Sequence, residues 1–512
     1  MLTKIYAAAL QGIEAQIVTI EVNCTQGIQF FMVGLPDAAV KESHQRIISA
    51  LSHNGLKFPR RKVVVNLAPA DIKKEGSAYD LPIAIGLLAA NEELKSDKFR
   101  DYLIMGELSL DGSILPIKGA LPIAIMAKEQ GYRGFILPKE NALEAAVVEG
   151  LEVFGVENIN EVVAYFNDEQ ELQPVIIDTQ SEFYDKQHLF NIDFEDVKGQ
   201  ENVKRAFEVA AAGGHNLIMI GPPGSGKSML AKRIPTILPP LTLDEALETT
   251  KIHSVAGRTS EGGSLITCRP FRSPHHTISG VALVGGGTYP QPGEISLAHN
   301  GVLFLDELPE FSRSVLEVMR QPLEDRKITI SRAKNTVEYP AGIMLVASMN
   351  PCPCGYYNHP TKECICSEGA VSRYLNRISG PLLDRIDIQI EVVPVEFDKL
   401  SSTVKGESSA VIRERVIKAR EMQTERFKDT PGVYCNAQMN TRLLNKWALP
   451  DSDSIAMLKT AMEKFNLSAR AYDRILKVAR TIADLEGSES VKSYHIQEAI
   501  TYRNLDRGNW GR

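Results

Sequence analysis

The segment from Gly221 to Ser228 constrains the fold of this 512-residue chain more than any other segment does. It follows an apolar run at 216–220 and precedes a helix-like run that starts at Met229, so we expect a strand, a tight loop and a helix. Glycines let the backbone N–H groups of such a loop surround a phosphate, and the helix N-terminus adds partial positive charge. The predicted phosphate-binding residues are Gly221, Pro222, Pro223, Gly224, Ser225, Gly226, Lys227 and Ser228.

The last two residues of this loop carry its chemistry. Lys227 is placed to reach the β and γ phosphates of a nucleotide, and Ser228 is placed to hold Mg²⁺. The sequence therefore predicts a site that uses ATP and Mg²⁺.

Two adjacent carboxylates end a second apolar strand. Residues 301–305 are followed by Asp306, which suits the shell of a Mg²⁺ ion, and by Glu307, which suits polarisation of an attacking water. A strand followed by a helix cap is the alternative, and it leaves the pair of acids downstream of a phosphate loop unexplained. We interpret the pair as the hydrolytic acids.

Two further positions complete the candidate catalytic set. Asn350 ends a third apolar strand, where a neutral amide can sense the γ-phosphate and orient the water without binding Mg²⁺ itself. Arg385 stands between Asp384 and Asp387. It is either a member of a local ion pair with one of these acids or an arginine finger that completes a neighbour's site.

Composition and charge narrow the class of protein. Hydrophobic residues make up 44% of the chain and charged residues 24%, which are ordinary values for a globular protein. No apolar run reaches the roughly 18 residues of a membrane span, and no clear secretory signal is present, so we expect a cytoplasmic protein. The net charge of −7 implies that any polyanion would bind at a local site.

The length predicts two or three domains. We expect an α/β domain at 1–166, a polar linker at 167–191, an ATPase core at 192–395 and a helical domain at 396–512. Predicted strands of the first domain lie at 15–22, 30–33, 62–67 and 102–106, and predicted helices at 38–54, 81–91 and 122–130.

Four cysteines fall within fifteen positions of the predicted core. Cys352, Cys354, Cys364 and Cys366 form two close pairs, and four thiolates suit a tetrahedral Zn²⁺ ion. Four free thiols are the alternative, and His359 is a possible substitute ligand. Four protein sulfurs would leave no open position, so the expected role of the ion is structural.

In this order, the phosphate loop, the acid pair, Asn350 and Arg385 resemble Walker A, Walker B, sensor 1 and the arginine finger of AAA+ ATPases. The phrases at 269–277, 292–301 and 467–474 are similar to the magnesium-chelatase-like YifB/ComM family, and the resemblance covers nearly the whole chain. It implies an α/β AAA+ core with a helical lid, a sensor 2 role for Arg470, and a ring, expected as a homo-hexamer, in which a neighbour completes each site.

The N-terminal domain resembles Lon-type serine proteases at 74–86 and 105–121. A Ser–Lys dyad needs a hydroxyl nucleophile and an amine. On this resemblance the two positions fall on Ile83 and Leu121, so we expect a domain without protease activity. A shifted alignment onto Ser77 and Lys118 is the alternative.

A predicted hairpin with basic residues suggests the substrate of the ATPase. Residues 326–339 alternate like two strands, and Arg332 and Lys334 lie near the middle. In the family that the chain resembles, a hairpin at this place enters the ring channel, so both residues are candidate contacts to single-stranded or branched DNA. The resemblance implies a DNA-translocating, branch-migrating helicase of recombination or transformation. A chelatase motor and a protein-remodelling motor remain the alternatives.

Overall fold

The computed structural model describes residues 2–187, 190–259, 264–287, 290–331, 336–357, 359, 361–395, 405–465 and 467–503. The chain forms two compact units. The N-terminal unit contains the chain up to residue 186 together with residues 242–267. The second unit contains residues 187–241 and the chain from residue 268 onward. The chain therefore passes from one unit to the other three times.

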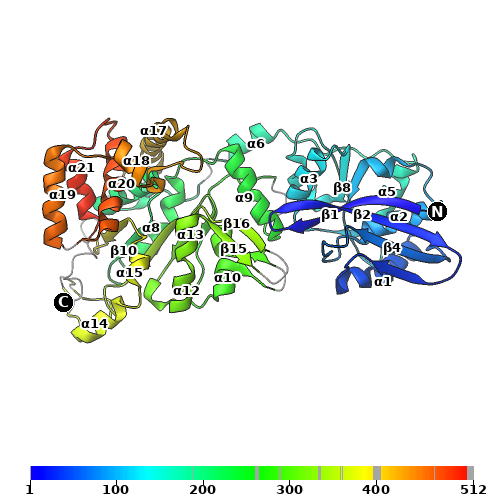
Figure 1. The fold of residues 1–512 in the computed structure, drawn as a ribbon, viewed down its shortest axis with the longest axis horizontal. Helices are drawn as coiled ribbons and strands as arrows, with labels where there is room; N and C mark the ends of the chain where they lie inside the picture. Colours follow the sequence, from blue (N-terminus) through cyan, green and yellow to red (C-terminus); the bar gives the residue numbers. More distant parts are fainter. Residues whose placement is uncertain are drawn as a thin grey trace. The chain divides into compact units, whose positions relative to one another are not determined.

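The N-terminal unit is an α/β structure built around a seven-stranded sheet of order β3-β4-β2-β1-β5-β8-β9 (Figure 1). Its strands are β1 (Leu2–Gln11), β2 (Glu14–Thr25), β3 (Phe30–Val33), β4 (Lys62–Ala68), β5 (Tyr102–Ile104), β6 (Glu107–Leu108), β7 (Ile114–Leu115), β8 (Gly134–Pro138) and β9 (Glu152–Val156). Its helices are α1 (Ala38–His53), α2 (Asp80–Ala90), α3 (Ala120–Glu129), α4 (Lys139–Ala146), α5 (Ile159–Phe166), α6 (Thr179–Lys186) and α9 (Leu243–Val255).

A long antiparallel hairpin of β1 and β2 forms the middle of this sheet, and Leu2 pairs with Asn23. The strands predicted at 15–22, 30–33, 62–67 and 102–106 correspond to β2, β3, β4 and β5. Strand β1 was not predicted. Its residues Ala7, Ala8 and Ala9 are all buried, so they show no alternation, and alanine has a low strand propensity.

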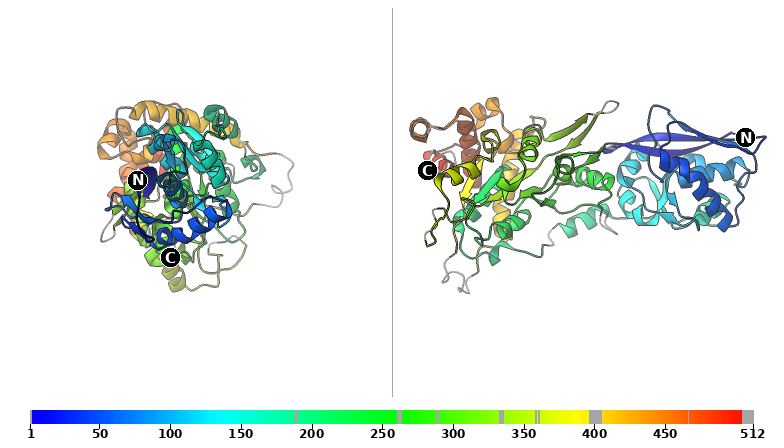
Figure 2. Two further views of the ribbon diagram at one scale, coloured as in Figure 1. Left: turned by 90° about the vertical axis from the view of Figure 1, so that its right-hand side faces the viewer. Right: turned by 90° about the horizontal axis from the view of Figure 1, so that it is seen from below.

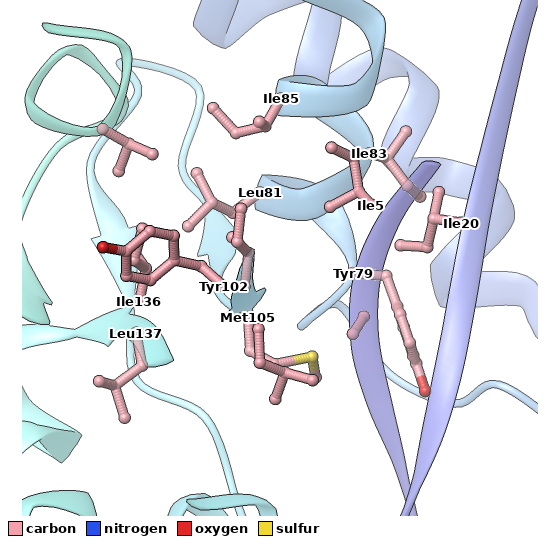
Figure 3. Packing of buried hydrophobic residues seen from close by; sticks show 14 of the residues in the cluster. Ile5, Ile20, Tyr79, Leu81, Ile83, Ile85, Tyr102, Met105, Ile136 and Leu137 are labelled. Carbon is pink, nitrogen blue, oxygen red and sulfur yellow. The ribbon is translucent and has the colours of Figure 1, made fainter. Parts of the chain in front are cut away.

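Helix α2 lies in the centre of the N-terminal core and packs against β1 and β2. All of its residues are buried, as expected for a helix that is apolar on every side. Figure 3 shows its residue Ile83 beside Ile5 and Ile20, within the buried cluster. The buried carboxylate of Asp80, in the first turn, pairs with Arg46 at 2.6 Å.

Residues 242–267 belong to the N-terminal unit although the chain reaches them after the phosphate loop. Their helix α9 packs against α3, where the N–H of Gly119 donates to the carbonyl of Ser254 at 3.1 Å. Leu247 and Leu265 pack against the N-terminal core. The segment is thus an integral part of this unit.

The second unit contains a five-stranded sheet of order β11-β14-β17-β10-β18 and the helices around it. Its strands are β10 (Leu217–Ile220), β11 (Phe271–Arg272), β12 (Gly285–Gly286), β13 (Gln291–Pro292), β14 (Val302–Leu305), β15 (Lys327–Ser331), β16 (Thr336–Pro340), β17 (Met344–Met349) and β18 (Ile388–Glu391). Its first helices are α7 (Glu201–Gly213), α8 (Lys227–Arg233), α10 (Gly280–Val284), α11 (Glu294–Leu297), α12 (Arg313–Val318), α13 (Arg320–Asp325), α14 (Glu368–Leu375) and α15 (Gly380–Leu383).

Helices dominate the C-terminal part of this unit, in agreement with the prediction. They are α17 (Ser409–Phe427), α18 (Thr441–Trp447), α19 (Ser452–Phe465), α20 (Ala469–Leu485) and α21 (Ser493–Thr501). Helices α17 and α20 pack against α7, and their buried side chains share one apolar cluster with β10 and β18. Figure 2 shows these helices in orange and red beside the green and yellow elements of the same unit. Among the helices in the described part of the chain, none is long and apolar enough to cross a membrane.

Candidate functional site

The five-stranded sheet brings the predicted catalytic segments to one edge. Strand β10, which leads into the phosphate loop, pairs in parallel with β17, and β17 pairs in parallel with β14. The carboxyl ends of parallel strands meet at the same edge of a sheet, where α/β proteins bind their ligands. Gly221, Asp306 and Asn350 each follow one of these three strands.

Left-handed backbone conformations shape the phosphate loop. Gly224 and Gly226 have φ values of 78° and 88°, and α8 begins at Lys227 directly after them. Lys227 is 8% exposed, and its Nζ donates to the carbonyls of Gly221 at 2.7 Å and Pro222 at 2.9 Å. Burial lowers the pKa of Lys227, against the opposing effect of the nearby acids Asp306 and Glu307.

Asp306 is held by hydroxyl groups from two other segments. Ser228 Oγ donates to Asp306 Oδ2 at 2.6 Å, and Ser348 Oγ donates to Oδ1 of the same carboxylate. Ser228 and Asp306 thus present oxygen ligands side by side, which is the donor chemistry that Mg²⁺ prefers. Ser348 was not predicted as part of the site, because its place two residues before Asn350 inside a buried strand gives no sequence signal.

Glu307 differs from its neighbour in conformation and exposure. It has a φ of 53°, and its side chain is 56% exposed, so the carboxylate is accessible to water. His276 Nδ1 lies 3.7 Å from Glu307 Oε2. His276 was not predicted as part of the site, because its contact with Glu307 appears only in the fold.

Asn350 lies beside the phosphate loop, and its Oδ1 accepts a hydrogen bond from Lys227 Nζ at 3.3 Å. The structure therefore brings together five of the predicted positions: Lys227, Ser228, Asp306, Asn350 and, next to Asp306 in the chain, Glu307.

The two candidate arginines make other contacts. Arg385 pairs with Glu324 at 2.5 Å and donates to the carbonyl of Pro381 at 2.6 Å, and its side chain is 12% exposed. Its predicted alternative, an ion pair with Asp384 or Asp387, is not formed among the described residues. Arg470 is 66% exposed and pairs with Asp384 at 3.2 Å.

A buried network links the start of β18 to the lid helix α20. Asp387 accepts from Arg474 at 2.9 Å and lies 3.1 Å from His215 Nδ1. The other ring nitrogen of His215 is 2.8 Å from Thr481 Oγ1. Burial acts to raise the pKa of Asp387, but the nearby charge of Arg474 and the contact with His215 hold that pKa well below its usual range.

The four predicted cysteines lie together in the loop after β17. Their Sγ atoms are all within 4.8 Å of one another, and the group could hold a metal ion. The distances from Cys354 Sγ to those of Cys352 and Cys364 are 3.3 and 3.5 Å, and Cys352 to Cys364 is 3.7 Å. Bonds of about 2.3 Å to a tetrahedral Zn²⁺ separate sulfurs by about 3.8 Å, so the donor set fits such an ion.

The protease-like positions have no dyad chemistry. Ile83 and Leu121 are both fully buried and apolar. In the alternative alignment, Ser77 Oγ donates to Glu107, while the Lys118 side chain lies over Gly257. An added Cβ on Gly257 would be 2.9 Å from Lys118 Cε. Neither pair therefore forms a Ser–Lys dyad.

The predicted DNA contacts Arg332 and Lys334 lie outside the described residues. The two strands that lead to them are present as the antiparallel pair β15 and β16, in which Lys327 pairs with Pro340 in register (Figure 1).

Family models match three parts of the chain. Residues 193–400 match "Magnesium chelatase, subunit ChlI", residues 20–141 match "Subunit ChlI of Mg-chelatase", and residues 406–503 match "Magnesium chelatase, subunit ChlI C-terminal". The fold and the convergent site thus define a magnesium-chelatase-type AAA+ ATPase. Membership of this class implies use of ATP and Mg²⁺, and AAA+ proteins often form oligomers.

Full-length relatives place the chain more narrowly. It is 44% identical to competence protein ComM of Haemophilus influenzae over 99% of this chain and 98% of that protein. It is 43% identical to YifB of Salmonella typhimurium over 99% of this chain and 98% of that protein. The chain belongs to the ComM/YifB family. It is also 31% identical to Lon protease 2 of Bacillus subtilis, over 27% of this chain and 26% of that protein.

Proposed function

We propose that this protein hydrolyses ATP at the edge of the five-stranded sheet. In this proposal Lys227 binds the β and γ phosphates, Ser228 and Asp306 hold Mg²⁺, Glu307 activates water and Asn350 orients it. The observation that carries the proposal is the 2.6 Å hydrogen bond between Ser228 and Asp306, because it joins two segments 78 residues apart in the arrangement that a shared cation needs. A bound Mg²⁺ supplies charge neutralisation at the phosphates.

We infer that the active form is a homo-hexameric ring in which Arg385 acts on the site of a neighbouring subunit and Arg470 acts as sensor 2. The Nε of Arg385 is buried and has no hydrogen-bond partner among the described residues, so this guanidinium retains an unused donor. Light scattering in the presence of ATP tests the ring. A monomer that hydrolyses ATP at the full rate contradicts it.

We propose that the work done is translocation along DNA, with branch migration in recombination or transformation as its use in the cytoplasm. Two features support this proposal: the full-length similarity to a protein named for competence, and the hairpin β15–β16 between Glu307 and Asn350. The N-terminal unit would then serve as a collar that guides nucleic acid, because Ile83 and Leu121 leave it without a dyad.

The ATPase rate with and without single-stranded and branched DNA tests this function. We expect both DNAs to raise the rate, and we expect the double variant Arg332→Ala, Lys334→Ala to lose most of the stimulation. Lys327→Ala is the matched control, since Lys327 lies at the base of the same hairpin and already pairs with Glu338 at 3.0 Å. An ATPase without any DNA stimulation would favour a chelatase or protein-remodelling motor.

We also propose that Cys352, Cys354, Cys364 and Cys366 bind one structural Zn²⁺. Their sulfur separations support this assignment. Elemental analysis of purified protein should find close to one zinc per chain, and a content well below one removes the proposal.

A further inference from the structure

The cysteine loop, residues 351–366, begins directly after Asn350, the residue that follows β17. That strand is tied to the phosphate loop at two points. The N–H of Gly221 donates to the carbonyl of Met349 at 3.2 Å, and Lys227 Nζ donates to Asn350 Oδ1 at 3.3 Å. The first residue of the cysteine loop, Pro351, is therefore fixed close to the phosphate loop.

Gly355 brings the middle of the cysteine loop onto the phosphate loop itself. A Cβ added at Gly355 would lie 2.5 Å from Pro223 Cδ and 2.7 Å from Pro223 Cγ. Gly355 also has a φ of 84°, which side chains rarely adopt. The close approach of Pro223 and the positive φ both require glycine at position 355. The backbone of Gly355 therefore contacts the ring of Pro223.

A small pocket lies between the two loops and the end of β18. Gly221 and Pro222 line it from the phosphate loop, and Pro351, Gly355 and Tyr357 line it from the cysteine loop. The pocket has a cavity volume of about 40 Å³. Beside the contact of Gly355 with Pro223, the two loops thus leave some space unfilled.

The described residues of the cysteine loop contain no helix or strand, so its shape needs another source of order. Ordering each residue of such a segment costs about 1–2 kcal/mol of conformational entropy. Metal binding by four cysteines can offset this cost, because its binding free energy becomes folding free energy when no site exists in the unfolded segment.

We propose that metal occupancy of the four-cysteine site controls the affinity of the phosphate loop for nucleotide. The bound ion orders the cysteine loop, holds Gly355 on Pro223 and keeps Asn350 beside Lys227. Loss of the ion releases the loop, and the phosphate loop loses the support that holds its binding conformation. The inference rests on the proposed nucleotide and zinc sites, and it adds a thermodynamic link between them.

Such a link is reciprocal. Couplings between sites typically change affinity by about 5- to 150-fold, and each ligand must change the affinity for the other by the same factor. We expect nucleotide to bind about tenfold more weakly to the metal-depleted protein, and a saturating non-hydrolysable ATP analogue to strengthen metal binding by the same factor.

The first experiment measures binding of a non-hydrolysable ATP analogue to the full chain by titration calorimetry, always with excess Mg²⁺. The zinc-loaded protein, the zinc-depleted protein and the depleted protein supplied again with Zn²⁺ are compared, with circular dichroism to check that each is folded. The second experiment measures Zn²⁺ affinity by competition with a chromogenic chelator, with and without the analogue.

A pair of variants separates the loop contact from metal binding. Gly355→Ala keeps all four cysteines but places a Cβ against Pro223, so it should retain zinc and still bind the analogue about tenfold more weakly. Gly432→Ala is the matched control, because Gly432 has a similar φ of 78° with no atom within 4 Å of an added Cβ. It should bind the analogue as the wild type does.

The outcomes are distinct. Weaker analogue binding after depletion, restored by Zn²⁺, together with the Gly355→Ala effect supports the inference. Equal analogue affinity in the loaded and depleted proteins overturns it while nucleotide binding stands. If the protein takes up no zinc, the inference fails because the proposed metal site does not exist. If the zinc-loaded protein binds no analogue, both the inference and the proposed ATPase activity fail.

Discussion

Asp306 and Glu307 are adjacent carboxylates in different surroundings. Asp306 accepts hydrogen bonds from Ser228 and Ser348, so its position is fixed by its neighbours. Glu307 has a left-handed backbone, an exposed side chain and His276 3.7 Å away. A fixed acid suits a cation and an accessible acid suits a water, so the two residues are suited to different tasks.

Replacing the accessible acid should therefore separate binding from hydrolysis. We expect Glu307→Gln to lower ATP turnover by about 10²–10⁴-fold, the usual contribution of a general base, while binding of ATP is retained. Steady-state turnover and calorimetric binding measure the two effects. Glu310→Gln is the control, because Glu310 lies three residues away and pairs with Arg377 at 3.0 Å. Full turnover by Glu307→Gln would remove Glu307 from the mechanism.

At the scale of elements, helix α20 is joined to the ATPase sheet through buried polar groups. Asp387, which immediately precedes β18, contacts Arg474 of α20 and His215, which precedes β10. His215 in turn contacts Thr481 of α20. The lid helix that carries Arg470 is thus connected to the strand that leads into the phosphate loop.

Asp387 is the centre of this network, and replacing it should destabilise the folded protein. We expect Asp387→Ala to lower the free energy of unfolding by about 3–5 kcal/mol, because Arg474 would lose its carboxylate partner in a largely buried site. Denaturant unfolding of the full chain measures the change. Asp384→Ala is the comparison, since the exposed pair of Asp384 and Arg470 should contribute about 0–1 kcal/mol. Equal costs for the two variants would contradict the buried network.

The buried amine of Lys477, on α20, makes the stability of the folded protein depend on pH. Burial, together with the charge of Arg474, lowers the pKa of Lys477 to about 8, whereas an unfolded lysine titrates near about 10.4. Below pH 8 the folded state bears the full penalty of the buried charge. Between pH 8 and about 10.4 the folded protein binds fewer protons than the unfolded chain, so the contribution of Lys477 to stability rises with pH.

The variant Lys477→Met removes this penalty. We expect it to raise the thermal unfolding midpoint at pH 7 and to lose that advantage by about pH 10.4, as measured by calorimetry at both pH values. Lys459→Met changes an exposed lysine and should show no such pH-dependent difference. A constant difference between wild type and Lys477→Met across this range would show that the charge is not the cause.

At the scale of the whole molecule, each unit depends on segments that are distant in the sequence. Residues 242–267 complete the N-terminal unit, where Thr259 Oγ1 contacts Glu144 at 3.3 Å. The other oxygen of the buried Glu144 accepts from the N–H of Leu121 at 3.0 Å, at the start of α3. One carboxylate thus joins this later segment to α3, the helix that contains Leu121.

The N-terminal unit should therefore be unstable without this segment. We expect a fragment of residues 1–186 to unfold about 6–12 °C below the same fragment joined to residues 242–267 by a flexible linker. Lost burial of the partly buried Leu247 and Leu265 and of the fully buried Ile252 accounts for about 3 kcal/mol. Each kcal/mol lowers the unfolding midpoint by about 2–4 °C. Thermal unfolding followed by circular dichroism compares the two. Equal midpoints would show that the segment is dispensable.

Local rules predicted much of this fold. Strand β3 and helix α1 lie within one residue of their predicted bounds, because period-two and helical patterns are local signals. The phosphate loop and the acid pair follow from short motifs for the same reason. Ser348, His276 and the network around Asp387 were not predicted as parts of the site, since each acts through a partner from a distant segment.

The sequence by itself determined the class of protein, because the phosphate loop, the acids and the four cysteines are short strings whose chemistry depends on neighbours in the chain. Only the tertiary structure decided that residues 242–267 complete the N-terminal unit and that Gly355 lies on Pro223. Such contacts arise when side chains far apart in sequence pack into one space, and no local pattern in the sequence indicates which of them meet. The phosphate loop is thus a local sequence motif, whereas its contact with Gly355 depends on tertiary packing.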